Sequence, residues 1–256
     1  MTSNLLLEEM TRVEATNAAN ANTLVVWPIG AIEQHGPHLP VGTDTLIVKH
    51  LAEEAAKDAN KEIPVVVAPT LPFGSSDHHL PFGGTMSLST QLFYQTVSEI
   101  AESLIKSKFK RLYLLNSHGG NHELLQLVAR DLVLKHAVSI ASASYWNVAW
   151  EELTDLDAHV NRRLPGHAGS FETSIILSLK PNLVKEPIPS RKSVESTDPR
   201  GFGRPVREEH SGSWLKINGY SDNPKDADEK IGNNWLKTII KALSQSMIKF
   251  YKDSNI

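Results

Sequence analysis

Carboxylate and imidazole side chains gather in residues 27–44, Trp-Pro-Ile-Gly-Ala-Ile-Glu-Gln-His-Gly-Pro-His-Leu-Pro-Val-Gly-Thr-Asp. They belong to Glu33, His35, His38 and Asp44. Three prolines and three glycines interrupt the segment, so we expect a loop rather than a regular helix. Glu33 and His35 are two residues apart and, in extended backbone, point to the same side, where both can reach one ion. Carboxylate and imidazole together suit a catalytic divalent metal.

Each of these residues also has a simpler interpretation. A single Glu-x-His pattern is short and common, and it is also typical of a solvated surface turn. Asp44 is followed by a predicted helix, where a carboxylate at the N-terminus stabilises the helix dipole. The loop therefore needs partners from elsewhere in the chain before a metal site is indicated.

The segment Asn116-Ser117-His118-Gly119-Gly120-Asn121 supplies one such partner. A predicted strand ends here, which places His118 at its tip as a candidate ligand, and the glycines allow close approach of the backbone. A glycine-rich turn before a helix is alternatively a phosphate cradle. The chain lacks both Gly-x-Gly-x-x-Gly and Gly-x-x-x-x-Gly-Lys-Ser/Thr, so nucleotide binding is poorly supported.

A third cluster lies in residues 166–174, Gly-His-Ala-Gly-Ser-Phe-Glu-Thr-Ser. His167 stands between small residues, which suits an imidazole that approaches a substrate. Glu172 falls in the first turn of the next predicted helix, where its alternative role is compensation of the dipole, with Ser170 as N-cap. Two imidazoles and three carboxylates without a thiol suit Zn²⁺, Mn²⁺ or Fe²⁺. A bridging carboxylate such as Asp44 indicates two ions about 3.5–4 Å apart.

Bulk composition narrows the class of protein. The chain has 256 residues, a formal charge of −3 and no cysteine. We expect one domain, 1–256, with no attraction to nucleic acid or to a membrane surface. The absence of cysteine excludes disulfides, thiolate ligands and a cysteine nucleophile, and fits a reducing cytoplasm. The N-terminal apolar run is cut by Glu8 and Glu9, so neither a signal peptide nor a membrane span is expected.

Apolar runs and helical periodicity alternate along the chain. Strands are predicted over 24–29, 65–68, 111–116 and 138–145, and helices over 5–19, 44–59 with Thr43 as N-cap, 89–106, 121–136, 171–179 and 226–251. This alternation predicts a parallel α/β sheet with helices on both faces. Residues 187–225 carry little periodicity and are interpreted as a lid or an intersubunit arm.

In such sheets the ligand crevice lies beyond the carboxyl ends of the strands. The loops that carry Glu33, the Asp77-His78-His79 triplet, His118 and Tyr145-Trp146 each follow a predicted strand. We therefore expect these four loops to converge on one edge of the sheet.

With these motifs in this order, the chain resembles the creatininase (creatinine amidohydrolase) family. The resemblance rests on Glu-Gln-His-Gly-Pro-His-Leu-Pro with a following Thr-Asp, on Asn-Ser-His-Gly-Gly-Asn, and on His-Ala-Gly-Ser-Phe-Glu-Thr-Ser, in this order between about residues 27 and 179. It also includes Gly-Gly-Thr-Met-Ser at 83–87. The resemblance implies a three-layer α/β/α sandwich, a homo-hexamer and metal-dependent hydrolysis of a C–N amide bond.

The resemblance also implies the metal ligands. Glu33, Asp44 and His118 would hold one ion, while His35, Asp44 and a further glutamate would hold the second. In creatininase itself that glutamate lies two residues after the histidine that matches His118, where this chain has Gly120. We therefore expect Glu172 to replace it, either as a ligand or as a residue that assists the attacking water.

Roles in catalysis follow from the same resemblance. His167 would donate a proton to the leaving nitrogen. The expected substrate contacts are Ser76, Gly119, Trp146 and Arg163. Arg162 and Arg163 either bind an anionic group or form a solvated basic turn, and His78 and His79 either line the pocket or lie at the surface. His38 is expected to hydrogen-bond behind the ligands rather than to bind metal.

The substrate is expected to be a small molecule with a cyclic amide, a formamide or a small peptide-like bond. Creatinine itself is disfavoured, because the second tryptophan expected over it is missing near 162–164 and Gly119 replaces a tyrosine. Three alternatives remain: a true creatinine amidohydrolase, hydrolysis of a sugar-derived ring ketone with the same metals, and a non-catalytic metal-binding scaffold.

Overall fold

A four-stranded parallel sheet lies at the centre of the computed structural model, which describes residues 4–160, 162, 164–191 and 210–254. Its strands are β1 (Leu24–Ile29), β2 (Val65–Val67), β3 (Arg111–Asn116) and β4 (Ser139–Ser144), in the order β2-β1-β3-β4. β1 and β3 run side by side along their whole length, from Leu24 opposite Arg111 to Ile29 opposite Asn116. Both are entirely buried, as expected for parallel strands covered on two faces.

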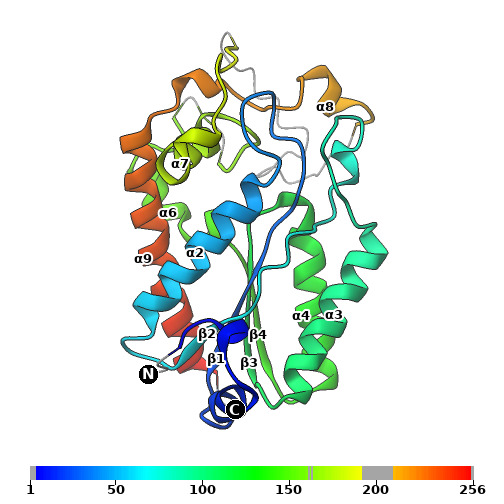
Figure 1. Cartoon of the computed structure of the whole chain (residues 1–256), viewed down its shortest axis with the longest axis vertical. Helices are drawn as coiled ribbons and strands as arrows, with labels where there is room; N and C mark the ends of the chain where they lie inside the picture. Colours follow the sequence, from blue (N-terminus) through cyan, green and yellow to red (C-terminus); the bar gives the residue numbers. More distant parts are fainter. Residues whose placement is uncertain (1–3, 161, 163, 192–209, 255–256) are drawn as a thin grey trace.

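Helices form the two outer layers (Figure 1). One face is covered by α2 (Thr43–Ala59), α5 (Tyr145–Val148), α6 (Trp150–Asp155), α7 (Ser170–Leu179) and α9 (Glu229–Asp253), and the other by α1 (Arg12–Asn20), α3 (Thr90–Lys106) and α4 (His122–Lys135). Successive side chains of β1 enter opposite cores: Leu24 and Val26 pack on the α2/α9 side, Val25 and Trp27 on the α3/α4 side. The architecture is the expected three-layer α/β/α sandwich.

Most predicted elements are confirmed, with differences at their starts. The helix predicted over 5–19 is wrong in its first part, where Leu7–Glu9 form a 3₁₀ turn and α1 starts later. Thr11 caps α1 in a capping box with Glu14, which fixes that start. Thr43 is the first residue of α2 rather than its N-cap, because its hydroxyl donates to the Pro40 carbonyl. Ser170 likewise begins α7, and Gly169 is the N-cap.

The strand predicted over 138–145 ends at Ser144, and two short helices that were not predicted, α5 and α6, follow it. Short turns account for further differences. Gly119–Asn121 form a 3₁₀ turn before α4, and Pro224–Asp226 form one before α9, whose N-cap is Asp228. The segment predicted to lack regular structure contains α8 (Ser213–Lys216), while 192–209 lie outside the described residues. Among the described parts of the chain, no helix has the length and apolar character needed to cross a membrane.

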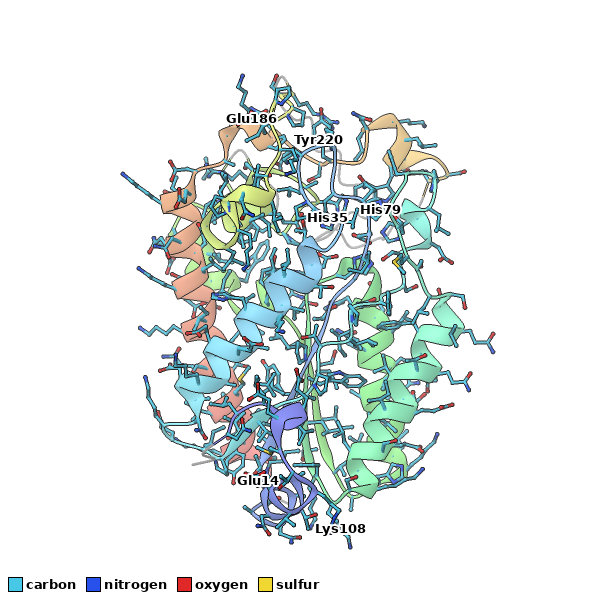
Figure 2. All side chains as sticks on the ribbon, in the orientation of Figure 1. Glu14, His35, His79, Lys108, Glu186 and Tyr220 are labelled. Carbon is cyan, nitrogen blue, oxygen red and sulfur yellow. The ribbon has the colours of Figure 1, made fainter. Side chains whose placement is uncertain are left out.

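The loops that follow the strands lie together at one end of the molecule. Figure 2 shows His35 and His79 close together beyond the carboxyl ends of the strands, at the N-terminal end of α2. Glu14 and Lys108 mark the opposite end. His118, which follows β3, lies 3.2 Å from Glu33 of the loop after β1. The convergence expected from the sequence is thereby confirmed for the loops after β1, β2 and β3.

Candidate metal centre

Five side chains with ligand chemistry meet at this end of the sheet. Glu33 and His35 come from the loop after β1, Asp44 from the first turn of α2, His118 from the tip of β3 and Glu172 from the first turn of α7. None is more than 3% exposed. Three carboxyl groups and two imidazoles are thus removed from water together.

Asp44 lies between the other four residues. Its two oxygens face different histidines: Oδ2 lies 3.3 Å from His118 Nδ1, and Oδ1 lies 3.5 Å from His35 Nε2. Glu33 Oε1 is 3.2 Å from the same nitrogen of His118, and Glu172 Oε2 is 3.7 Å from the same nitrogen of His35. The arrangement places a carboxylate where it can bridge two cations.

Backbone carbonyls orient both histidines. His35 Nδ1 lies 3.1 Å from the Glu33 carbonyl oxygen, and His118 Nε2 lies 3.1 Å from that of Ser75. A carbonyl only accepts, so these nitrogens carry the proton in the neutral rings. The lone pairs of His35 Nε2 and His118 Nδ1 therefore face the carboxylates. Metal-binding histidines are held in this way, with the second nitrogen donating to a fixed acceptor.

Several polar atoms of the cluster are buried without a hydrogen-bond partner among the described residues. They are Glu33 Oε2, His35 Nε2, Asp44 Oδ2 and His79 Nε2. Leaving such groups unpaired costs stability unless a cation coordinates them. Their concentration at one point, with oxygen and imidazole donors, fits a divalent metal.

The ionisable side chains of the cluster shift one another's pKa values. Burial by itself lowers the pKa of His35, but the Asp44 and then the Glu172 carboxylate outweigh burial and raise it to about 10. His118 behaves alike: burial opposes protonation, yet Glu33 and Asp44 raise its pKa to about 10. Burial also raises the pKa of Glu172 to about 8, with Asp44 adding to the effect. In the metal-free protein protons thus offset the carboxylates, and metal binding would displace them.

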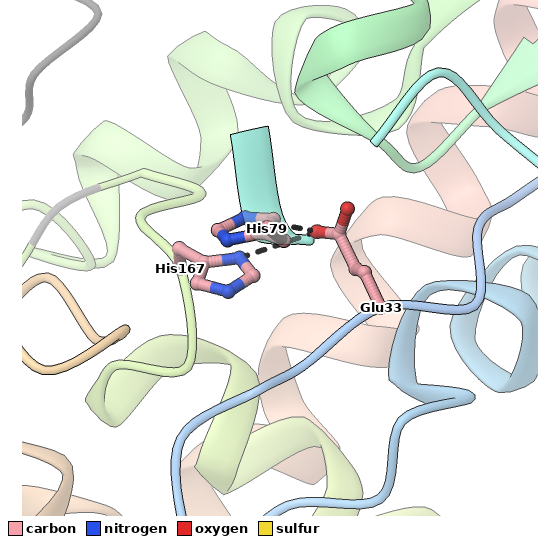
Figure 3. A group of neighbouring side chains, drawn as sticks. All are labelled: Glu33, His79 and His167. Carbon is pink, nitrogen blue, oxygen red and sulfur yellow. Dashed lines mark ion pairs between the residues drawn. The ribbon is translucent and has the colours of Figure 1, made fainter. Parts of the chain in front are cut away.

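A second group of imidazoles adjoins Glu33 from the other side. His79 Nε2 and His167 Nδ1 each lie 3.5 Å from Glu33 Oε1 (Figure 3). The two rings stack, with centroids 4.2 Å apart and planes 17° from parallel. His79 is completely buried, so the surface alternative is wrong for this residue, while its place in the lining of the substrate pocket stays a prediction.

Residues 8–247 match the creatininase family, described as creatinine amidohydrolase. The chain belongs to this family. Mycofactocin precursor peptide peptidase of Mycolicibacterium smegmatis is 33% identical over 163 residues, which cover 62% of this chain and 59% of that protein. Creatinine amidohydrolase of Pseudomonas putida is 28% identical over 203 residues, which cover 72% and 75% of the two chains. The chain therefore spans less than two thirds of the length of the first of these relatives.

A solved creatinine amidohydrolase (creatininase) has the same fold. It superposes with a TM-score of 0.80 over 98% of this chain and 100% of that chain, at 23% identity. Further creatininase structures with TM-scores of 0.78 include a manganese form and a mutant of Zn-Zn type. The creatininase fold expected from the three sequence motifs is confirmed.

Gly120, at the position expected to hold a glutamate in creatininase itself, is closely packed. A Cβ at this position would overlap the Ser75 carbonyl oxygen and lie 2.5 Å from His118 Nε2. The loop conformation therefore admits no side chain here. Glu172 stays the predicted replacement, and its carboxylate does reach His35.

Gly120→Ala is accordingly expected to lower zinc affinity by about 10–100-fold, because the added methyl group displaces the carbonyl that orients His118. Competition with a chromophoric chelator measures this affinity. Gly83→Ala is the matched control, since a Cβ at residue 83 meets nothing within 4 Å. Equal zinc affinities in the two variants would contradict the packing argument.

The other predicted contacts differ in their placement. Ser76 is buried with its hydroxyl 3.3 Å from His118 Nε2, and Gly119 directly follows that histidine. Trp146 is 1% exposed and packs in the core on the α2/α9 side, so its contact with substrate stays a prediction. Arg163 lies outside the described residues.

Two aromatic residues lie at the site: Tyr145, whose loop was expected at this edge of the sheet, and Trp214, which sequence reasoning did not assign to it. The Tyr145 hydroxyl is buried without a hydrogen-bond partner in the described structure, and burial, with the charges of Glu172 and Asp44, raises its pKa well above 10. Trp214 of α8 lies against the imidazoles, its ring centroid 4.6 Å from His79 and 5.1 Å from His167. Tyr145 follows β4 directly, which is a usable signal; nothing in the sequence around Trp214 indicates its position.

His38 hydrogen-bonds behind the ligands, as expected. Thr173 Oγ1 donates to the Gly169 carbonyl and lies 2.9 Å from His38 Nε2, so that nitrogen donates to Thr173 and carries the proton. Nδ1 is buried without a hydrogen-bond partner among the described residues. Burial, with the nearby charge of His35, lowers the pKa of His38 from 6.5 to about 4.

This shift predicts a loss of stability in acid. Between pH 6.5 and 4 the unfolded chain binds a proton at His38 that the folded protein does not, so the free energy of unfolding falls as the pH falls. His38→Gln keeps an amide donor for Thr173 but does not titrate, and its pH dependence is expected to be shallower in this window. Urea unfolding of the two chelator-treated proteins measures how the free energy of unfolding depends on pH. An equal pH dependence in the wild type and in His38→Gln would contradict the role given to His38.

Proposed function

We propose that this protein is a metal-dependent hydrolase that cleaves a C–N amide bond other than an ordinary protein peptide bond. The observation that carries the proposal is the meeting of Glu33, His35, Asp44 and His118 with their ligand atoms turned toward one another. Three atoms of this group, Glu33 Oε2, His35 Nε2 and Asp44 Oδ2, are buried without a hydrogen-bond partner among the described residues. Family membership supports the proposal, because the related proteins are named as an amidohydrolase and a peptidase.

Two divalent ions fit the donor set. Glu33, Asp44 and His118 would hold one, and His35, Asp44 and Glu172 the other. Ions bound there would supply a hydroxide nucleophile near neutral pH and would polarise the substrate carbonyl. Zn²⁺, Mn²⁺ and Fe²⁺ all suit these ligands.

His167 would transfer the proton from the attacking water to the leaving nitrogen. Its Nε2 lies 2.8 Å from the Gln34 backbone carbonyl oxygen, which fixes the ring, and its Nδ1 faces Glu33. The neutral ring therefore presents the Nδ1 lone pair to the site. We propose that Nδ1 takes a proton from the attacking water and passes it to the leaving nitrogen, so that an amine leaves as the C–N bond breaks.

Elemental analysis tests the metal requirement. Protein purified without chelator is expected to contain about two divalent ions per chain. Removal of the metal should abolish turnover, and zinc or manganese should restore it. Full turnover of metal-free protein would overturn the proposal.

The substrate is proposed to be a cyclic amide, a formamide or a small peptide. A panel of creatinine, a formamidopyrimidine, a hydantoin and short peptides separates these, with a sugar-derived ring ketone as the competing chemistry. Turnover of the ketone alone would replace the amide assignment, and no turnover with full metal occupancy would favour the scaffold alternative. A homo-hexamer and a cytoplasmic location are proposed from family resemblance, and light scattering tests the assembly.

A further inference from the structure

The side-chain amide of Gln34 has its orientation fixed by two backbone groups. Its Oε1 accepts a hydrogen bond from the Gly36 N–H at 2.9 Å, and its Nε2 donates to the Gly219 carbonyl oxygen at 3.0 Å. Exchanging the two atoms would place donor against donor and acceptor against acceptor. The close approach also requires the glycine, since a Cβ at Gly219 would overlap the amide.

One hydrogen of this amide remains after the bond to Gly219. Two ring nitrogens lie within reach of it, His79 Nδ1 and His167 Nε2, each 2.9 Å from Gln34 Nε2. His167 Nε2 also lies 2.8 Å from the Gln34 backbone carbonyl, which accepts only, so this nitrogen carries a proton and has no lone pair to offer. The remaining amide hydrogen therefore goes to His79 Nδ1.

The hydrogen bond from Gln34 determines which ring nitrogen of His79 carries the proton. A neutral imidazole that accepts at Nδ1 carries its proton on Nε2. That nitrogen lies 3.5 Å from Glu33 Oε1, is buried, and has no hydrogen-bond partner among the described residues. The ring of His167 stacks on that of His79, and its Nδ1 lone pair points to the same Glu33 Oε1. Both histidines thus carry the proton on Nε2 but turn opposite edges toward Glu33: His79 its N–H and His167 its lone pair.

We infer that His79 donates a hydrogen bond from Nε2–H to the substrate oxygen that gains negative charge, and that Gln34 is the positioning residue that holds His79 in this tautomer. Although Glu33, His79 and His167 form a group that could hold a metal ion, this tautomer has no lone pair at Nε2, so His79 is not a ligand. A preformed donor aimed at developing charge lowers the barrier of acyl transfer. The substrate contact rests on the proposed function; the tautomer does not.

Nitrogen-15 spectra of histidine-labelled protein test the tautomer, in the metal-free and in the zinc-loaded state. The His79 signals are assigned by their loss in His79→Gln. We expect a protonated Nε2 and an unprotonated Nδ1 in both states. In Gln34→Glu, where only acceptor oxygens face the ring, Nδ1 is expected to become protonated. A bare or zinc-bound Nε2 in the wild type overturns the inference, whatever the activity.

Kinetics test the substrate contact. His79→Leu is expected to lower kcat about 10²–10³-fold at unchanged zinc content, and His79→Gln, which keeps a donor nitrogen, to recover part of the loss. Gln34→Met removes the positioning bond and is expected to cost about 10–100-fold in kcat. Unchanged kcat in His79→Leu overturns the contact. Absence of turnover in the wild type on every substrate would count against the proposed function, while the spectra still decide the tautomer.

Discussion

Asp44→Asn is expected to bind at most half of the wild-type complement of zinc and to lose about 10³-fold or more in kcat. The reason is geometric: its two carboxylate oxygens face His118 and His35 separately, and an amide offers one neutral oxygen in their place. Loss of about 4 kcal/mol of charge stabilisation in the transition state corresponds to this factor. Elemental analysis and steady-state kinetics on the best substrate of the panel give the two values.

The fold of this variant should survive, which separates loss of ligation from loss of structure. The carboxylate at the start of α2 contributes only about 0.3–1 kcal/mol through the helix dipole. Asp58→Asn is the control on the same helix, because Asp58 is partly exposed and pairs with Lys61 at its far end. Wild-type metal content in Asp44→Asn would contradict the bridging role.

His167→Gln is expected to keep its metal and to lose about 10²–10⁴ in kcat with little change in KM. A glutamine amide can still donate to the Gln34 carbonyl as His167 Nε2 does, so the local packing is retained. It cannot take up and release a proton, however, so the leaving nitrogen departs unassisted. Single-turnover measurements on zinc-loaded protein isolate the chemical step.

His159→Gln provides the comparison for that substitution, since His159 is exposed and lies outside the three motifs. Its kcat should equal that of the wild type. If His167→Gln also retained full turnover, the proton transfer would have to be assigned to another group of the site, with Tyr145 the first candidate because its buried hydroxyl lies near Glu172 and Asp44.

Local sequence patterns were sufficient for the sheet and insufficient for the helix starts. β1 and β3 have the residues predicted for them, since each is a short apolar run with clear ends. The start of α1 depends on a capping box between Thr11 and Glu14, which the apolar periodicity of the preceding residues obscures. Helix starts are decided by single hydrogen bonds, whereas strands in a buried sheet are decided by overall apolarity.

The residues of the candidate site also fall into two groups: those predicted from short motifs and those that only the fold brings to the site. Residues within short motifs, such as Glu33 and His118, were predicted because the types and spacing of ligands are visible in sequence. Gln34 was not, because its partners lie 45, 133 and 185 residues away and are brought to it only by the fold. Trp214 was missed for the same reason: its contacts with His79 and His167 come from a different part of the chain. The ligand roles themselves remain predictions.

The main chain, rather than other side chains, holds three of the four described histidine rings that lie within 3.5 Å of a Glu33 or Asp44 oxygen. The carbonyl oxygens of Glu33, Gln34 and Ser75 face His35, His167 and His118 respectively. Substitution of neighbouring side chains therefore leaves the proton positions of these rings intact, as long as the backbone keeps its path. His79 differs, because an exchangeable side chain determines its tautomer. The related proteins are named for different substrates. At the His79 ring one substitution can turn a hydrogen-bond donor into an acceptor, so the preferred substrate can change while the proposed metal ligands stay the same.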